Sequence, residues 1–246
     1  MPKIETIKLR CLDPEAQKQF YITRLGMGLR EDGAVSYSDA EAGILFEHAE
    51  APYQPTAGDT YWKIALAVQN IERACDELTA MGIEVSAPRQ FRDVGYLAHF
   101  QDPEGFKIEL IEHWFQGSRP EGQADAPMFK GNACLNLLTL RTHAITPLRE
   151  AFLGWGMTPL LVQPVEPYGF TLHFFAFTEE TPPNENLLAV ENREWVYQRP
   201  YTVLELQEVH DAPPMSDTPD RAAGYEGTWV SGANGSVANK GLRISS

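Results

Sequence analysis

The strongest constraint on the fold of this chain is a plan of strand, helix and further strands that recurs three times along the sequence. Each repeat opens with a short alternating apolar strand, passes into an amphipathic helix and ends in a strand that carries Leu and Glu. One β-α-β-β-β unit cannot bury both faces of its own sheet. We therefore expect an α+β fold in which such units pair and leave a cup between them. The predicted first strands lie at 6–10, 63–68 and 137–141, and the last strands at 44–48, 109–113 and 205–208.

The repeats suggest a division of the chain into modules. Residues 1–116 would hold two units, which make one complete module, and residues 117–131 have the Gly, Ser, Pro and Gln content of a linker. Residues 132–211 would form a third unit, half of a second module. Residues 212–246 are expected to be an irregular tail, so a fourth unit is missing. An unpaired third unit exposes a sheet edge and an apolar face, which predicts either a homodimer through that unit or a truncated chain.

Charge and composition narrow the classes of partner. The 246-residue chain has a net charge of -14 and no basic stripe, so neither nucleic acid nor an anionic membrane is an expected partner. Three scattered cysteines do not make a disulfide framework, and no apolar run is long enough for a membrane span. We expect a cytoplasmic protein that acts on a small molecule.

The segment 102–113 predicts a tight turn that leads into a strand. Asp-Pro-Glu-Gly at 102–105 has turn chemistry, because Pro sets φ at the first central position and Gly relieves the last. In the strand that follows, Glu109 stands in an otherwise apolar run. A buried carboxylate is stable only when it is paired, protonated or bound to a cation, so Glu109 is the first candidate site residue.

The segments 62–70, 102–112 and 193–206 resemble the vicinal oxygen chelate superfamily, and within it glyoxalase I, the lactoylglutathione lyases. The resemblance implies the fold shared by glyoxalases, bleomycin resistance proteins and dihydroxybiphenyl dioxygenases, in which paired βαβββ units form curved-sheet cups. It also implies a lyase of methylglyoxal detoxification. Such an enzyme converts the hemithioacetal of glutathione and methylglyoxal into S-lactoylglutathione.

In that family one divalent metal is held in the cup by a His or Gln from the first strand and a Glu from the last strand of two facing units. The resemblance thus implies Zn, Ni or Mg as a cofactor, with a carboxylate moving the proton. Carried onto this chain, the positions are Lys63 and Glu109 in unit two, and Leu137 and Glu205 in unit three, with Asn136 one residue away. Glu109 and Glu205 are therefore the predicted metal ligands and catalytic bases, whereas both first-strand ligands are lost.

Lys63 leaves two interpretations open. Its ammonium either fills the place of the metal, which makes the cup a pseudo-site, or swings away while a metal binds through Glu109, Glu205 and water. Lys63 and Arg141 are the predicted substrate-binding residues, because Arg141 matches the family arginine that holds the glutamyl end of glutathione. His99 lies in a predicted strand, where each side chain points to one of the two faces of the sheet. One of these two orientations would bring His99 into the cup.

Three functions follow from these residues. The first is the glyoxalase I-like lyase. The second is a degenerate, non-catalytic member that binds a small molecule or assembles with an active paralogue. A ring-cleaving dioxygenase ranks last, because its Fe(II) requires two His and one Glu, and no first-strand His exists.

Overall fold

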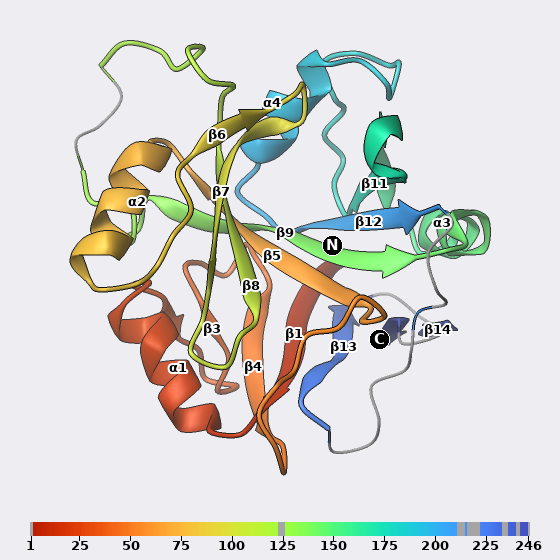
Figure 1. Ribbon diagram of the computed structural model, residues 1–246. Helices are drawn as coiled ribbons and strands as arrows, with labels where there is room; N and C mark the ends of the chain where they lie inside the picture. The colour runs from red at the N-terminus through yellow and green to blue at the C-terminus, as the bar shows by residue number, and fades with distance from the viewer. Residues whose placement is uncertain are drawn as a thin grey trace.

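The computed structural model describes residues 2–122, 126–210, 215, 222–232, 236–239 and 242–245. Three units follow one another along the chain, each with an opening strand, a helix and further strands, as predicted (Figure 1). The first contains β1 (Lys3–Cys11), α1 (Pro14–Thr23), β2 (Gly28–Leu29), β3 (Val35–Ser36) and β4 (Gly43–His48). The second contains β5 (Tyr61–Val68), α2 (Ile71–Ala80), β6 (Arg89–Phe91), β7 (Gly95–Gln101) and β8 (Lys107–Glu112). The third contains β9 (Ala133–Thr142), α3 (Ile145–Gly154), β10 (Thr158–Val165), the 3-10 turn η1 (Glu166–Tyr168), β11 (Phe170–Ala176), α4 (Glu191–Tyr197) and β12 (Val203–Val209). Then follow β13 (Gly224–Ser231), β14 (Ser236–Asn239) and β15 (Leu242–Ser245).

Side chains cap the start of the first two helices. The Asp13 carboxylate accepts a hydrogen bond from the backbone N–H of Ala16, and the Asn70 amide oxygen accepts one from that of Arg73, each at 3.0 Å. Gly82 follows α2 with φ of 77°, a left-handed conformation that suits glycine after a helix. None of the helices in the described part of the chain is both long and apolar enough to span a membrane.

Units two and three form one continuous sheet of eight strands, in the order β10-β11-β12-β9-β5-β8-β7-β6. The two opening strands, β5 and β9, join the units by pairing antiparallel, with Lys63 opposite Thr139. Each opening strand also pairs in parallel with the last strand of its own unit, β5 with β8 and β9 with β12. The four strands β8, β5, β9 and β12 therefore run side by side in the middle of the sheet.

Unit one belongs to a second sheet of seven strands, in the order β14-β15-β13-β1-β4-β3-β2. β13 pairs antiparallel with β1, and β15 pairs in parallel with β13. The expectation of an irregular tail is therefore wrong for the segments that form β13, β14 and β15. Residues 212–214, 216–221, 233–235, 240, 241 and 246 of that tail lie outside the described residues.

The third unit finds its partner within the chain. Its opening strand β9 is already paired with β5, so a second copy is not needed to cover that edge. The physical reason for expecting a homodimer through this unit is thereby removed. The module boundaries at 1–116, 117–131 and 132–211 stay a prediction.

Alternation along the central strands separates a core face from a cup face. On β5, Ile64 and Leu66 belong to a large apolar core to which α1, α2, α3 and both sheets contribute. Ala65 and Ala67 face the other way, into a smaller apolar cluster that includes residues of α4. Because both faces are covered, the strand is almost continuously buried. The cup lies on the second of these faces.

Candidate functional site

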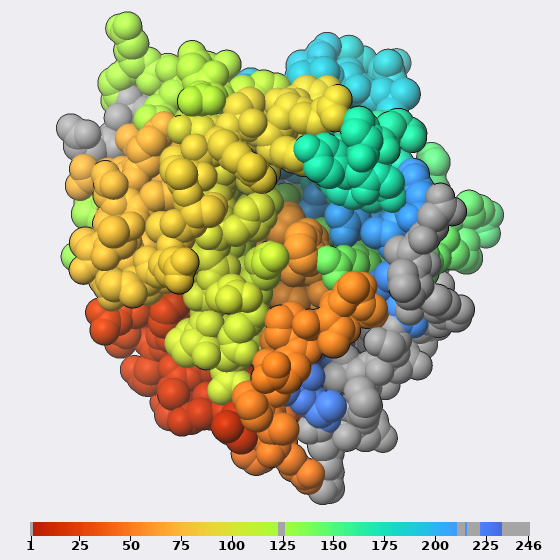
Figure 2. Space-filling view, in the orientation of Figure 1, coloured from red at the N-terminus to blue at the C-terminus, as the bar shows by residue number. Residues whose placement is uncertain are grey.

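A cavity of about 240 Å³ lies on the cup face of the eight-stranded sheet. The four central strands supply its floor, while β6, β7 and the segment around η1 supply walls. Figure 2 shows its opening as a hollow between the yellow segment of β6 and β7 and the teal segment around η1. Most of the lining is apolar or aromatic and a few polar groups converge on the floor, which is the usual composition of a small-molecule site.

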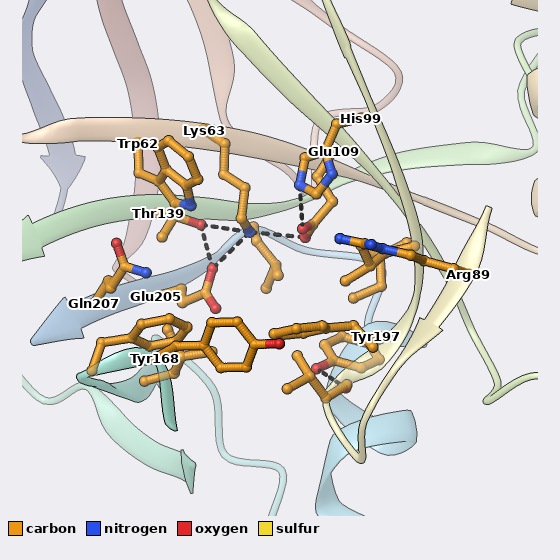
Figure 3. Close-up of a pocket in the computed structure, with 17 residues that line it drawn as sticks. Trp62, Lys63, Arg89, His99, Glu109, Thr139, Tyr168, Tyr197, Glu205 and Gln207 are labelled. Carbon is orange, nitrogen blue, oxygen red and sulfur yellow. Dashed lines mark hydrogen bonds and ion pairs between the residues drawn. The ribbon is translucent and has the colours of Figure 1, made fainter. Parts of the chain in front are cut away.

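The floor carries a buried ammonium between two carboxylates (Figure 3). Lys63 Nζ lies 2.8 Å from Glu109 Oε1 and 3.0 Å from Glu205 Oε2. It also donates to Thr139 Oγ1 at 3.0 Å, and the Thr139 hydroxyl in turn donates to Glu205 Oε2. Lys63, Glu109 and Glu205 are 6%, 4% and 3% exposed. An ammonium has three N–H donors, so these three acceptors satisfy it completely.

Strand register explains why these side chains meet. Thr139 lies opposite Lys63 on one side and opposite Glu205 on the other, since β9 pairs with both β5 and β12. Glu109 of β8 lies opposite Ala65 of β5. Because Ala65 is two residues beyond Lys63, the side chains of Lys63 and Glu109 project from the same face of the sheet. All four polar groups thus project from neighbouring strands into one cup.

His99 completes the group on the β7 side. It lies opposite Glu109 in the β7–β8 pairing, and its Nε2 is 3.1 Å from Glu109 Oε2. Burial alone would raise the pKa of Glu109, but the charge of Lys63 and the contact with His99 outweigh it and hold that pKa at about 2. Burial alone would lower the pKa of Lys63, but the two carboxylates outweigh it and raise that pKa above its ordinary value. Lys63 and Glu109 are therefore a charged pair at neutral pH.

This electrostatic arrangement predicts a specific loss of stability in acid. Between pH 4.5 and about 2 the unfolded chain takes up a proton at Glu109 that the folded chain does not. The free energy of unfolding contributed by Glu109, about 3 kcal/mol, is therefore fully present above pH 4.5 and is lost as the pH falls towards 2. Urea unfolding at pH 6, 4 and 3 should show a shallower pH dependence for Glu109→Gln than for wild type. Glu185→Gln, at an exposed carboxylate, controls for the change in net charge, and equal slopes for wild type and Glu109→Gln would contradict the pairing.

The residues present do not fit the predicted divalent metal. The structure brings both predicted ligands, Glu109 and Glu205, to the same cup, but the Lys63 ammonium lies in hydrogen-bonding contact with both. A dication between the same carboxylates would face a fixed positive charge at close range. Within the described ranges, no group of three or more His, Cys, Asp and Glu side chains has an arrangement that could hold a metal ion.

The structure changes the assignment of the unit-three position. Leu137 lines the cavity, but the side chain that meets Lys63 is Thr139, two residues further along β9. Asn136 points away, because its amide donates to the backbone oxygens of Val196 and Arg199. Thr139 was missed because the β5–β9 pairing shifts register between Tyr61 and Lys63 and again after Ala65. A local sequence pattern carries no signal for such shifts.

Arg141 lies behind the cavity wall. Its guanidinium stacks on the ring of Trp62, 4.1 Å from the centroid, and its Nε donates to Gln207 Oε1 at 3.2 Å. Trp62 and Gln207 line the cavity, whereas Arg141 supports them from outside. A direct contact between Arg141 and a substrate stays a prediction.

Aromatic residues that the sequence reasoning did not select form much of the wall. Phe91 of β6 and Tyr168 of η1 meet edge to face with ring centroids 5.1 Å apart, so the two units touch across the cavity mouth. Tyr197 of α4 is fixed by a hydrogen bond from its hydroxyl to the backbone oxygen of Val94 at 2.7 Å. Phe91 and Tyr168 carry no local signal, because only the pairing of units two and three brings them together.

Comparisons with known proteins agree with this architecture. Residues 3–110 match the model of the Glyoxalase/Bleomycin resistance protein/Dioxygenase superfamily. Lactoylglutathione lyases of Salmonella typhimurium and Escherichia coli O157:H7 are each 33% identical over 123 residues, which covers 42% of this chain and 87% of theirs. The crystal structure of glyoxalase I from Zea mays matches with a TM-score of 0.65 and 17% identity, covering 96% of this chain and 75% of that one. At that identity the structural likeness supports the fold alone. The sequence relatives and the fold together show that this chain belongs to the Glyoxalase/Bleomycin resistance protein/Dioxygenase superfamily.

Proposed function

We propose that this chain is a non-catalytic member of its family that binds a small organic molecule in the cavity, with the Lys63 ammonium in the place of a metal ion. The observation that carries the proposal is the contact of Lys63 Nζ with Glu109 and Glu205, at 2.8 and 3.0 Å. If Lys63 moved away, Glu109 and Glu205 would be left as buried charges without a cation, which is strongly unfavourable. The Lys63 side chain is therefore held in place. The apolar lining above it remains available to a ligand.

Lactoylglutathione lyase activity, which the curated relatives carry by name, has weaker support from the geometry. Metal-assisted proton transfer needs a metal site and a carboxylate base with a pKa near the working pH. Lys63 lies between the two carboxylates, and Glu109, with a pKa of about 2, is a weak base. The cavity of about 240 Å³ is also below the roughly 300–1,000 Å³ of pockets that enclose drug-sized ligands. A glutathione adduct would have to extend beyond it.

The remaining alternative functions have less structural support. A ring-cleaving dioxygenase needs two histidines, and among the described residues that line the cavity His99 is the single one. Assembly with an active paralogue stays a prediction. The proposal places the protein in the cytoplasm, since Cys11, Cys75 and Cys134 are free thiols.

Metal content and activity, measured on the same preparation, test the proposal. The protein is dialysed against Zn²⁺, Ni²⁺ or Mg²⁺, washed and analysed by plasma mass spectrometry. Formation of S-lactoylglutathione from the hemithioacetal of glutathione and methylglyoxal is then followed. We expect far less than one metal ion per chain and a rate equal to that without protein. Stoichiometric metal with turnover that Glu109→Gln and Glu205→Gln each abolish would establish the lyase instead.

A further inference from the structure

The floor of the cavity leaves one carboxylate oxygen without a donor. Glu109 has both oxygens engaged, Oε1 by Lys63 and Oε2 by His99. On Glu205, Oε2 accepts from Lys63 and Thr139, whereas Oε1 has no hydrogen-bond partner among the residues that the structure describes. Glu205 is 3% exposed and lines the cavity, so a donor reaches the free oxygen from inside the cavity. In Figure 3 its carboxylate lies between Lys63 and the ring of Tyr168.

The same group carries an unbalanced charge. One ammonium faces two carboxylates, which leaves one formal negative charge on the floor when the His99 imidazole beside Glu109 is neutral. Arg89, the other Lys or Arg side chain that lines the cavity, belongs to β6 and is exposed. An uncompensated charge beneath an apolar cavity is unfavourable, so a ligand that supplies a positive charge at this point gains free energy on binding.

Lys63 is not free to receive an anionic ligand. Its three N–H donors are taken by Glu109, Glu205 and Thr139. A ligand carboxylate placed on the floor would meet two carboxylates and no available donor from Lys63. The geometry therefore selects against anions at the floor as well as for cations.

The walls suit a cation with an apolar body. Tyr168, Phe170 and Tyr197 line the cavity together with Leu172, and aromatic faces attract ammonium groups. A cavity of about 240 Å³ accommodates a compound with one ring.

We propose that the cavity selects small amines, in which a protonated nitrogen on a single-ring or similarly sized apolar body donates a hydrogen bond to Glu205 Oε1. This inference rests on the proposed function and specifies its ligand class. The bound nitrogen balances the charge of the floor, and the body fills the apolar part of the cavity beneath Phe91 and Tyr168.

Three probes with the same aromatic body test the inference by calorimetric titration of the full chain: 2-phenylethylammonium, 2-phenylethanol and 3-phenylpropanoate. We expect the amine to bind about 10- to 100-fold more tightly than the alcohol, because its hydrogen bond to a buried carboxylate is charge-assisted. The acid should bind most weakly. Glu205→Gln should lower the affinity for the amine by a similar factor but the affinity for the alcohol by no more than a few-fold, since a neutral hydroxyl gains less from the carboxylate. Retained binding of the alcohol also shows that the variant keeps its cavity. The indole N–H signal of Trp62, assigned with Trp62→Phe, should shift in NMR spectra when the amine binds in the cavity.

The outcomes separate this inference from the proposed function. Equal affinity for amine and alcohol, or an amine affinity that Glu205→Gln does not change, overturns the amine preference and leaves a binding protein of another specificity. Absence of amine binding also overturns it. Stoichiometric metal and S-lactoylglutathione formation would remove the proposed function itself, whichever probe binds.

Discussion

Replacing Lys63 by methionine is expected to lower the free energy of unfolding by about 3–5 kcal/mol, because Glu109 and Glu205 are then buried without their cation. For a chain of this length the loss corresponds to a fall in melting temperature of about 6–20 °C. Methionine keeps the length and apolar stem of the side chain, so the change in packing is small. Calorimetry and urea unfolding at pH 7, in buffer treated with a chelator, measure the effect.

A matched variant separates charge from packing in that experiment. Lys63→Met combined with Glu109→Met and Glu205→Met removes all three charges of the floor, and replacing a buried ionic group by apolar side chains of similar volume is close to neutral for stability. The triple variant should therefore recover most of the loss. A Lys63→Met variant that melts within about 2 °C of wild type, which corresponds to about 0.5–1 kcal/mol, would show that the carboxylates do not depend on the ammonium.

The second large effect is the creation of a metal site by two substitutions. Lys63 and Thr139 are cross-strand neighbours whose side chains meet Glu205, and Glu109 lies beside them. Changing both to histidine removes the ammonium and places two imidazoles next to two carboxylates, a donor set that suits Zn²⁺ or Ni²⁺. We expect Lys63→His/Thr139→His to retain about one metal ion per chain after dialysis, where wild type retains essentially none.

The control for this design is Lys63→His/Leu137→His, which follows the ligand position predicted from the sequence. Leu137 lies opposite Ala65 and not opposite Lys63, so its imidazole would be displaced along the strand. This variant should bind metal more weakly than Lys63→His/Thr139→His, as measured by plasma mass spectrometry and calorimetric titration. Tighter binding by the Leu137 variant would contradict the register that places Thr139 in the group.

Most of the local plan of the fold could be predicted, because apolar alternation and helix caps are recorded in neighbouring residues. The pairing of the units depends on contacts far apart in the chain and was harder to predict. Strand β13 was missed because Gly224 and Gly227 make its sequence resemble a flexible tail, while its pairing with β1 provides the extended conformation. The same limit applies to the homodimer, whose rationale disappears once β5 and β9 pair within one chain.

In the candidate site, too, some residues could be predicted from the local sequence and others depend on long-range strand pairing. Glu109, Glu205 and Lys63 could be found because each is a charged residue at an alternating position of an otherwise apolar strand. Thr139 could not be found, because two register shifts decide which residue of β9 faces Lys63. Of the two interpretations of Lys63 that the sequence leaves open, the geometry favours the one in which the ammonium fills the metal's place.

The most direct test of that central claim is a crystal structure of the protein soaked in Ni²⁺, with data collected at the nickel absorption edge. We predict no anomalous peak between Glu109 and Glu205, and electron density that keeps Lys63 Nζ at about 2.8–3.0 Å from both carboxylates. An anomalous peak between the carboxylates, with the Lys63 side chain turned away, would contradict the account and return the cup to a metal site.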